Sequence, residues 1–282
     1  MKLAQVDYRG RSYAAAVVNG KVIDLGLPTV AQVLGSGKTH ADPGADSVPL
    51  QDVALLPPVS DQSRILCAGF NYRSHSTESG VIASKVPTFF TRFASSLVGH
   101  RTAIIRPSVS EMLDWEGEIA VVIGRGGHRI SAASAMSHVA GYVLFGDHSV
   151  RDFQLHGSQA TAGKNFDASG AIGPWIVTSD EAGEVDALAF TTTVNGRIMQ
   201  IGVLADLVHT VPALLAYVST FMRLRVGDVI ATGTPAGIGG RRQPPIWLRP
   251  GDTVQISSPQ LGDLTNPVVA ENATDSVKGA SA

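Results

Sequence analysis

The sequence predicts a β-rich α+β fold, with a small N-terminal β-rich domain ahead of a larger domain. Three observations predict it: short apolar runs rich in β-branched residues recur, two Asn-Gly pairs separate such runs, and thirty glycines and fifteen prolines fall in short clusters. This pattern is typical of short strands joined by tight turns. We expect the small domain and its linker at residues 1–60, the larger domain at 61–270, and a disordered polar tail at 271–282.

In the small domain, residues 12–18 and 21–25 are predicted strands joined by Asn19-Gly20, the strongest two-residue hairpin signal. Residues 28–34 are a predicted short helix. In the larger domain, the predicted strands are 65–69, 87–93, 118–123, 141–145, 172–178 and 188–194. Apolar residues at helical spacing predict an amphipathic helix over 204–221, which Pro212 could kink.

Charge and composition exclude several classes of protein. With 22 basic and 24 acidic residues the net charge is -2, which does not favour nucleic acid or an anionic membrane surface as a partner. No apolar run approaches the roughly 18 residues that span a bilayer, and the first residues lack the apolar region of a secretion signal. The single cysteine, Cys67, lies in an apolar strand and is predicted to pack in the core. We expect a cytoplasmic protein.

Two glutamates enter a buried strand side by side. The apolar run from Ile119 to Ile123 follows Glu116 and Glu118, whose side chains point the same way, roughly 7 Å apart along the chain. Two carboxylates entering a core repel each other. Either the strand emerges into water at this end, or a cation lies between the two carboxylates.

A third carboxylate follows a later strand. Asp147 comes directly after the predicted strand 141–145. With Glu116 and Glu118 it could complete an oxygen site for a hard divalent cation such as Mg²⁺ or Mn²⁺. The alternative is that Asp147 is only the N-cap of the following helix.

Other residues could serve catalysis or substrate binding. His75 and Glu78 would share one side of a helical turn, and a carboxylate that orients an imidazole makes a general base for activating water. Arg151 and Gln154 have the same spacing and could hold an oxyanion, as could Lys164. Near a divalent cation, Lys164 would also lose its proton readily. For each of these residues, exposure on a solvated surface is the alternative.

Two further features suit an anionic substrate. Arg92 lies among aromatic residues in the predicted strand 87–93 and could meet a substrate carboxylate, or it could reach past Phe93 into solvent. The loop at 232–239 has glycines and threonines whose N–H and hydroxyl groups could contact an anion. It lacks the lysine and the following helix of a phosphate-binding loop, and no dinucleotide fingerprint is present.

Five motifs, in this order, resemble those of the fumarylacetoacetate hydrolase family across residues 60–270. They are Gly69-Phe70-Asn71-Tyr72 with His75 and Glu78, Asp114-Trp115-Glu116-Gly117-Glu118, Gly146-Asp147 with Arg151-Asp152, Gly163-Lys164-Asn165-Phe166-Asp167, and Thr232-Gly233-Thr234-Pro235-Ala236-Gly237. The resemblance implies the family's mixed β-roll with few helices, usually a homodimer, acting on a small 2-oxo or 2,4-dioxo acid.

The resemblance also implies a role for each matching residue. The metal ligands for Mg²⁺ or Mn²⁺ would be Glu116, Glu118 and Asp147, the catalytic residues His75, Glu78 and Lys164, and the substrate-binding residues Arg151, Gln154, Thr234 and Arg92. Arg92 departs from the family pattern, because relatives often carry a lysine there. Asp114 stands where some relatives have histidine, and we do not count it as a ligand.

The implied reaction is hydrolysis of a C–C bond in a 2,4-dioxo acid of the acylpyruvate type. Glu78 would orient His75, which would deprotonate water for attack on the distal carbonyl, and the metal would hold the departing carbanion as the enolate of pyruvate. The same machinery could instead decarboxylate or isomerise a 2-oxo acid such as oxaloacetate or 2-hydroxyhepta-2,4-diene-1,7-dioate. A non-catalytic binding module with the same fold is a further alternative.

Overall fold

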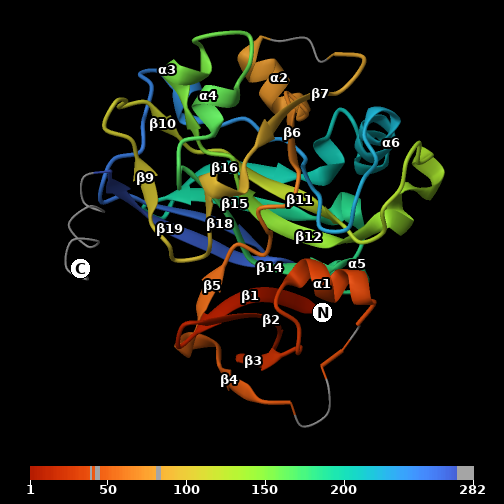
Figure 1. Cartoon of the computed structure of the whole chain (residues 1–282). Helices are drawn as coiled ribbons and strands as arrows, with labels where there is room; N and C mark the ends of the chain where they lie inside the picture. Colours follow the sequence, from red (N-terminus) through yellow and green to blue (C-terminus); the bar gives the residue numbers. More distant parts are fainter. Residues whose placement is uncertain (39, 42–44, 81–83, 272–282) are drawn as a thin grey trace.

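The computed structural model describes residues 1–38, 40–41, 45–80 and 84–271. In this part of the chain, twelve strands form one sheet (Figure 1). Its hydrogen-bonded path runs β4 (Ser47–Pro49), β3 (Lys21–Asp24), β2 (Arg11–Val18), β1 (Lys2–Tyr8), β14 (Gly170–Thr178), β12 (Val139–Gly146), β11 (Gly117–Ile123), β17 (Val229–Ala231), β6 (Ile65–Gly69) and β7 (Thr88–Arg92). Off this path, β5 (Ala54–Leu56) pairs with β1, and β8 (Leu97–Val98) pairs with β14.

A second sheet packs against the first. Its order is β16 (Arg197–Val203), β15 (Ala189–Val194), β18 (Thr253–Ser258), β19 (Gly262–Ala270) and β9 (Ile104–Arg106), while β10 (Leu113–Asp114) and β13 (Ser149–Val150) form a separate pair. Ile119 and Leu144 of the large sheet share a core with Ile256 and Leu264 of the second. The prediction of a β-rich α+β fold is confirmed.

The helices are short and lie between the strands. They are α1 (Val30–Ser36), α2 (Arg73–Ser79), α3 (Arg151–Gln154), α4 (Thr161–Lys164), α5 (Ser179–Ala182) and α6 (Val211–Phe221). Short 3-10 helices span Leu50–Asp52, Ala94–Ser96, Ala132–His138, Val185–Ala187, Leu204–Asp206 and Gly239–Arg241. In Figure 1, α2, α3 and α4 gather at the end of the molecule opposite the N-terminal strands. None of the helices in the described ranges is long and apolar enough to cross a membrane.

The N-terminal strands are an extension of the main sheet. The predicted hairpin forms between β2 and β3, where Asn19 and Gly20 have φ values of 50° and 73°. Strand β1 pairs with β14 through Lys2↔Val177, so the first strands continue the sheet of the larger domain. A domain boundary near residue 60 stays a prediction. The predicted tail lies outside the described residues, apart from Glu271.

The predicted long helix starts later than expected. Helix α6 begins at Val211, so the prediction of a helix from residue 204 is wrong for its first seven residues. Pro212 lies in the first turn, where its missing N–H leaves no helical hydrogen bond unmade, and it does not kink the helix. Upstream, the backbone N–H groups of Val208 and His209 donate to Asn71 instead. A tertiary contact therefore overrides the helical pattern there.

The register of β11 and β12 places the third carboxylate. The two strands are antiparallel, and Gly117 pairs with Gly146. The residues just beyond this pair, Glu116 and Asp147, are therefore neighbours, and the Asp147 N–H donates to the Glu116 carbonyl at 2.9 Å. Cys67 is fully buried in β6, as predicted, and burial raises the pKa of its thiol well above the usual range.

Candidate metal centre and catalytic site

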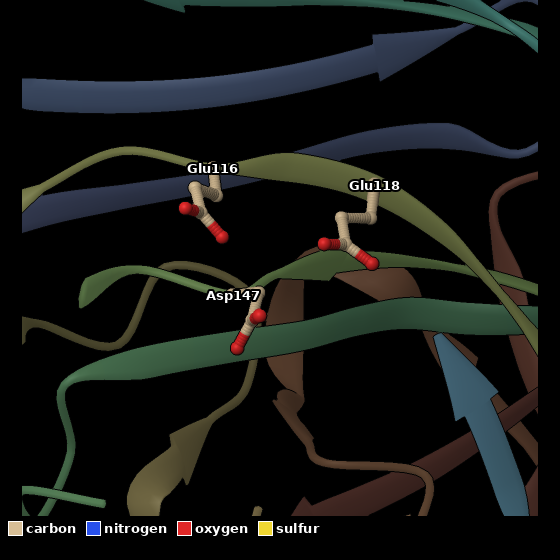
Figure 2. A group of neighbouring side chains, drawn as sticks. All are labelled: Glu116, Glu118 and Asp147. Carbon is tan, nitrogen blue, oxygen red and sulfur yellow. The ribbon is translucent and has the colours of Figure 1, made fainter. Parts of the chain in front are cut away.

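Three buried carboxylates converge at the end of β11. One oxygen from each of Glu116, Glu118 and Asp147 lies within 4.8 Å of the other two. Figure 2 shows both glutamates on the same side of one strand, with Asp147 close to them. The three residues are 6%, 1% and 0% exposed, respectively, which excludes the alternative that this strand end opens into water.

Glycine allows the strand to pack tightly at this point. A Cβ on Gly117, between the two glutamates, would come within 2.0 Å of the Thr192 hydroxyl oxygen. The Gly117 N–H donates to the Gln200 side chain at 2.9 Å, and its carbonyl accepts from the Thr234 hydroxyl at 2.9 Å. The backbone between the glutamates is thus fixed from both sides.

Lys164 and Arg151 hold Glu116, and Lys164 also holds Asp147. Lys164 Nζ donates to Glu116 Oε2 at 2.6 Å and to Asp147 Oδ2 at 2.7 Å, and Arg151 donates to Glu116 Oε1 at 2.6 Å. Burial would raise the pKa of Glu116, but Lys164 and Arg151 outweigh burial and lower it well below the usual range. Glu116 is therefore ionised at neutral pH.

Lys164 reaches this position because α4 packs closely on α3. A Cβ on Gly163 would lie 2.5 Å from the Gln154 backbone nitrogen, so only glycine permits the approach. Burial alone would lower the pKa of Lys164, yet Asp147 and Glu116 outweigh burial and raise it. Without a cation in the site Lys164 is therefore a charged donor, and the expectation that it loses its proton readily near a divalent cation stays a prediction.

Glu118 has no cation of its own. Its Oε2 accepts the Gly233 N–H at 2.8 Å, and no Lys or Arg among the described residues pairs with it. Burial, then the charges of Asp147 and Glu116, raise the pKa of Glu118 well above the usual range. A buried carboxylate of this kind is costly unless it is paired or binds a metal. The all-oxygen donor set fits a divalent cation of the Mg²⁺ or Mn²⁺ type.

His75 and Glu78 form a pair on α2. His75 Nδ1 lies 3.3 Å from Glu78 Oε2, and the His75 ring stacks on Phe70 with ring centroids 5.4 Å apart. Glu78 Oε1 accepts the Gly237 N–H at 3.0 Å. Burial lowers the pKa of His75 despite the opposing influence of Glu116 and Glu78, so the ring is neutral near pH 7. A neutral, oriented imidazole has the properties of a general base.

One cavity of about 730 Å³ connects these groups. Its lining includes His75, the three carboxylates, Arg151 and Lys164, and on its other walls Phe89, Leu155 and Trp247. A space of this size accepts a small organic acid together with a cation.

The structure places the predicted substrate-binding residues differently. Arg151 and Gln154 line the cavity and are joined by a hydrogen bond of 2.8 Å. Thr234 also lines it, but its hydroxyl donates to the Gly117 carbonyl and accepts from Gln200. Arg92 is outside the cavity lining found in the described residues. Its guanidinium is buried and donates to Asp147 Oδ1 at 2.8 Å, to Ser96 and to Ser169.

Sequence reasoning missed several residues that hold the site together. Asp114, fully buried, accepts from Arg151 Nε at 2.8 Å and from the N–H groups of Gly239 and Gly240. Gln200 binds both the Gly117 N–H and Thr234. Gly233, with φ of 101°, supplies the N–H that binds Glu118. The charge of Asp114 beside the glutamates was a usable signal, whereas nothing in the sequence marks Gln200.

Comparisons with known proteins agree with this architecture. Residues 64–269 match the family model for the fumarylacetoacetate hydrolase C-terminal domain. The human protein named oxaloacetate tautomerase FAHD2A, mitochondrial, is 38% identical over 263 residues, covering 90% of this chain and 84% of that protein. The fumarylacetoacetate hydrolase structure from Exiguobacterium antarcticum is 33% identical, with a TM-score of 0.86, and covers 96% of this chain and 100% of that chain.

A further solved structure extends the range of named activities. The 2-hydroxyhepta-2,4-diene-1,7-dioate isomerase from Mycobacterium marinum is 32% identical, with a TM-score of 0.78, and covers 96% of this chain and 99% of that chain. These similar proteins are named as a tautomerase, a hydrolase and an isomerase. The fold, the order of the motifs and the match over most of the chain lead to one conclusion: this protein belongs to the fumarylacetoacetate hydrolase family.

Proposed function

We propose that the protein is a metal-dependent enzyme that interconverts the enol and keto forms of a 2-oxo acid. The observation that carries the proposal is the single cavity that joins a neutral, carboxylate-oriented His75 to three buried carboxylates, one of which, Glu118, lacks a cation. The names of the relatives, a tautomerase and an isomerase among them, support this reaction class.

The metal site would be formed by Glu116, Glu118 and Asp147. A divalent cation bound there would supply Lewis-acid chemistry, which would make the C–H next to the 2-oxo group more acidic. We expect Mg²⁺ or Mn²⁺, because all three ligand groups are carboxylates.

The chain's own residues would move the proton and hold the charge. His75, with Nδ1 directed to Glu78, would use Nε2 to transfer a proton between C3 and the enol oxygen. Lys164, protonated and buried, would stabilise the enolate oxygen, and Arg151 with Gln154 would hold the substrate carboxylate. Arg92, held away from the cavity, would instead fix the position of Asp147.

Hydrolysis of a C–C bond in a 2,4-dioxo acid is the second candidate. The His75–Glu78 pair favours it, because the same neutral imidazole could deprotonate a water molecule instead of a carbon. A similar structure is named a fumarylacetoacetate hydrolase. Decarboxylation of oxaloacetate would use the same carboxylate site without this base.

One experiment separates these reactions. Purified protein with Mg²⁺ is given enol-oxaloacetate and, separately, an acylpyruvate, while enol decay, pyruvate and CO₂ are followed. Faster enol decay without pyruvate supports the tautomerase, whereas pyruvate from the acylpyruvate supports the hydrolase. Activity that persists in EDTA and in Glu116→Ala would contradict the metal mechanism. No turnover of any substrate would favour a non-catalytic module.

The homodimer and the cytoplasmic location stay predictions. Equilibrium sedimentation of the purified chain tests the first. The relative named above as mitochondrial leaves the second to be settled by fractionation of the source cells.

A further inference from the structure

Among the described residues that line the cavity, one basic side chain makes no ion pair or hydrogen bond. Three basic side chains, Arg151, Lys164 and Arg241, contribute to the lining. Arg151 is paired with Asp114 and Glu116, and Lys164 with Glu116 and Asp147. Arg241 is exposed, and its side chain makes no ion pair or hydrogen bond within the described residues. Its charge is therefore available to a ligand in the cavity.

The backbone that carries Arg241 is nevertheless rigid. Arg241 ends the short 3-10 helix Gly239–Arg241, whose first two N–H groups donate to Asp114 at 2.7 Å and 2.9 Å. A Cβ on Gly239 would lie 2.0 Å from the Ile246 carbonyl oxygen, so the turn is tightly packed at its base.

The same carboxylate ties this turn to the acid-binding side of the cavity. Asp114 Oδ2 accepts both the Gly240 N–H and Arg151 Nε, and Arg151 in turn binds Glu116. Two hydrogen bonds therefore connect the backbone of Arg241 to the arginine proposed to hold the substrate carboxylate. This fixes the backbone from which the Arg241 side chain extends relative to Arg151.

Apolar side chains contribute to the same cavity. Ile238, Trp247, Met112 and Leu155 belong to its lining, and a Cβ on Gly240, next to Arg241, would lie 3.3 Å from the Trp247 ring. A ligand that spans from Arg151 to Arg241 would therefore place an uncharged hydrocarbon chain in the middle and a charge at each end.

We propose that Arg241 binds a second, distal carboxylate, so that the preferred substrates are 2-oxo dicarboxylic acids with an apolar chain between the two acid groups. This inference rests on the proposed function, because it assumes that the 2-oxo acid end occupies the carboxylate site. A guanidinium that pairs with a carboxylate in a fork geometry provides the selectivity.

The test measures binding, which does not require turnover. Isothermal titration of the full-length protein in saturating Mg²⁺ compares 2-oxoglutarate with 2-oxopentanoate, and 2-oxoadipate with 2-oxohexanoate. Within each pair the chain length is the same, and only the terminal carboxylate differs from a methyl group. The variants are Arg241→Gln, Arg241→Lys and, as a matched control, Arg249→Gln, which removes an exposed arginine outside the cavity lining.

We expect the wild-type protein to prefer the dicarboxylate in at least one pair by about tenfold, as a partly exposed charge-assisted pair allows. Arg241→Gln should remove this preference and leave the affinity for the monocarboxylate unchanged. Arg241→Lys should retain part of the preference, and Arg249→Gln all of it.

Three results would overturn the inference. They are the absence of a preference in both pairs, an equal loss of both ligands in Arg241→Gln, and the same loss of preference in Arg249→Gln. If the wild-type protein binds 2-oxo acids without discrimination, the proposed function survives and only the role of Arg241 fails. If it binds neither member of either pair, both proposals fail together.

Discussion

The carboxylate floor of the cavity, formed by Glu116, Glu118, Asp147 and Lys164, is buried, and hydrogen bonds from several strands and loops fix its charges. Helix α2 on the same cavity is held differently. Glu78 is fixed by one backbone N–H and faces His75 at a longer distance of 3.3 Å.

The site therefore contains two kinds of group: fixed buried charges in the floor, and a less tightly held His75–Glu78 pair on α2. The charges in the floor are already in position before a ligand binds. In a site with little water, this arrangement strengthens their electrostatic interactions with the ligand. A buried charge without a partner, however, lowers the free energy of unfolding. The pair on α2 carries no such cost, because His75 is neutral and Glu78 lies nearer to solvent. Changes in the floor should therefore affect metal binding and stability, whereas changes on α2 should affect turnover alone.

The largest effect is expected for Glu118→Gln. Loss of a ligand should abolish the increase in melting temperature on adding Mg²⁺ and lower turnover by about 10⁴-fold, as a lost metal contribution of several kcal/mol implies. The metal-free protein should melt at the same or a higher temperature, because a buried carboxylate without a cation is replaced by a neutral amide.

Scanning calorimetry with and without Mg²⁺ measures both effects of Glu118→Gln. The exposed Glu111→Gln variant is the control. A full Mg²⁺ response in Glu118→Gln would remove this residue from the metal site.

His75→Gln should affect only the His75–Glu78 pair on α2. We expect kcat to fall by about a hundred- to ten-thousandfold, the usual contribution of a general base, while the Mg²⁺-dependent rise in melting temperature is kept. In the wild-type protein, burial lowers the pKa of His75, so kcat/KM should stay on its plateau at neutral pH and fall only below the ordinary titration range of histidine. A variant with unchanged turnover would exclude His75 as the base.

Some of this site could be predicted because its signals are local. The spacing of Glu116 and Glu118 places both side chains on one face of a strand, and a period of two needs no knowledge of the fold. The Asn19-Gly20 hairpin is local in the same sense, because both residues accept positive φ.

Other parts depend on contacts between distant segments. The register of β11 and β12 places Asp147 beside Glu116. From the sequence, this proximity is only one of two alternatives for Asp147. Arg92 lies in the expected strand, yet whether it faces the cavity or the protein interior is decided by Ser96, Ser169 and Asp147. The start of α6 is likewise set by Asn71, more than a hundred residues earlier.

Asp114→Asn tests how strongly the floor depends on a residue that touches neither metal nor substrate. The amide keeps the shape but loses the charge that orients Arg151, and a hydrogen bond to a charged group contributes about 1.5–3 kcal/mol. We expect KM for a 2-oxo acid to rise about tenfold with kcat changed much less, since binding rather than proton transfer is affected.

Steady-state kinetics of Asp114→Asn beside the exposed Asp186→Asn control provide the measurement. An equal fall of kcat and kcat/KM would place Asp114 in the chemical step instead.

The smallest expected effect is a loss of stability at acidic pH, caused by His148, which lies next to the floor. His148 is buried beside the glutamates and accepts the Glu116 N–H at 3.3 Å, and burial, followed by Arg92, lowers its pKa from 6.5 to about 3. Because the unfolded chain binds this proton first, the stabilisation is complete above pH 6.5 and is lost as the pH falls toward 3. The loss approaches about 1.4 kcal/mol per pH unit.

Urea unfolding of the metal-free protein at pH 7.5 and pH 5 measures this slope. His148→Asn, which offers an amide oxygen to the Glu116 N–H, should lose about 2 kcal/mol less than the wild-type protein over that interval. The exposed His128→Asn variant is the control and should lose as much as the wild-type protein. If the free energy of unfolding of His148→Asn falls with pH as steeply as that of the wild-type protein, protonation of other residues causes the loss of stability. The carboxylate floor would then differ from α2 in its charges but not in its sensitivity to pH.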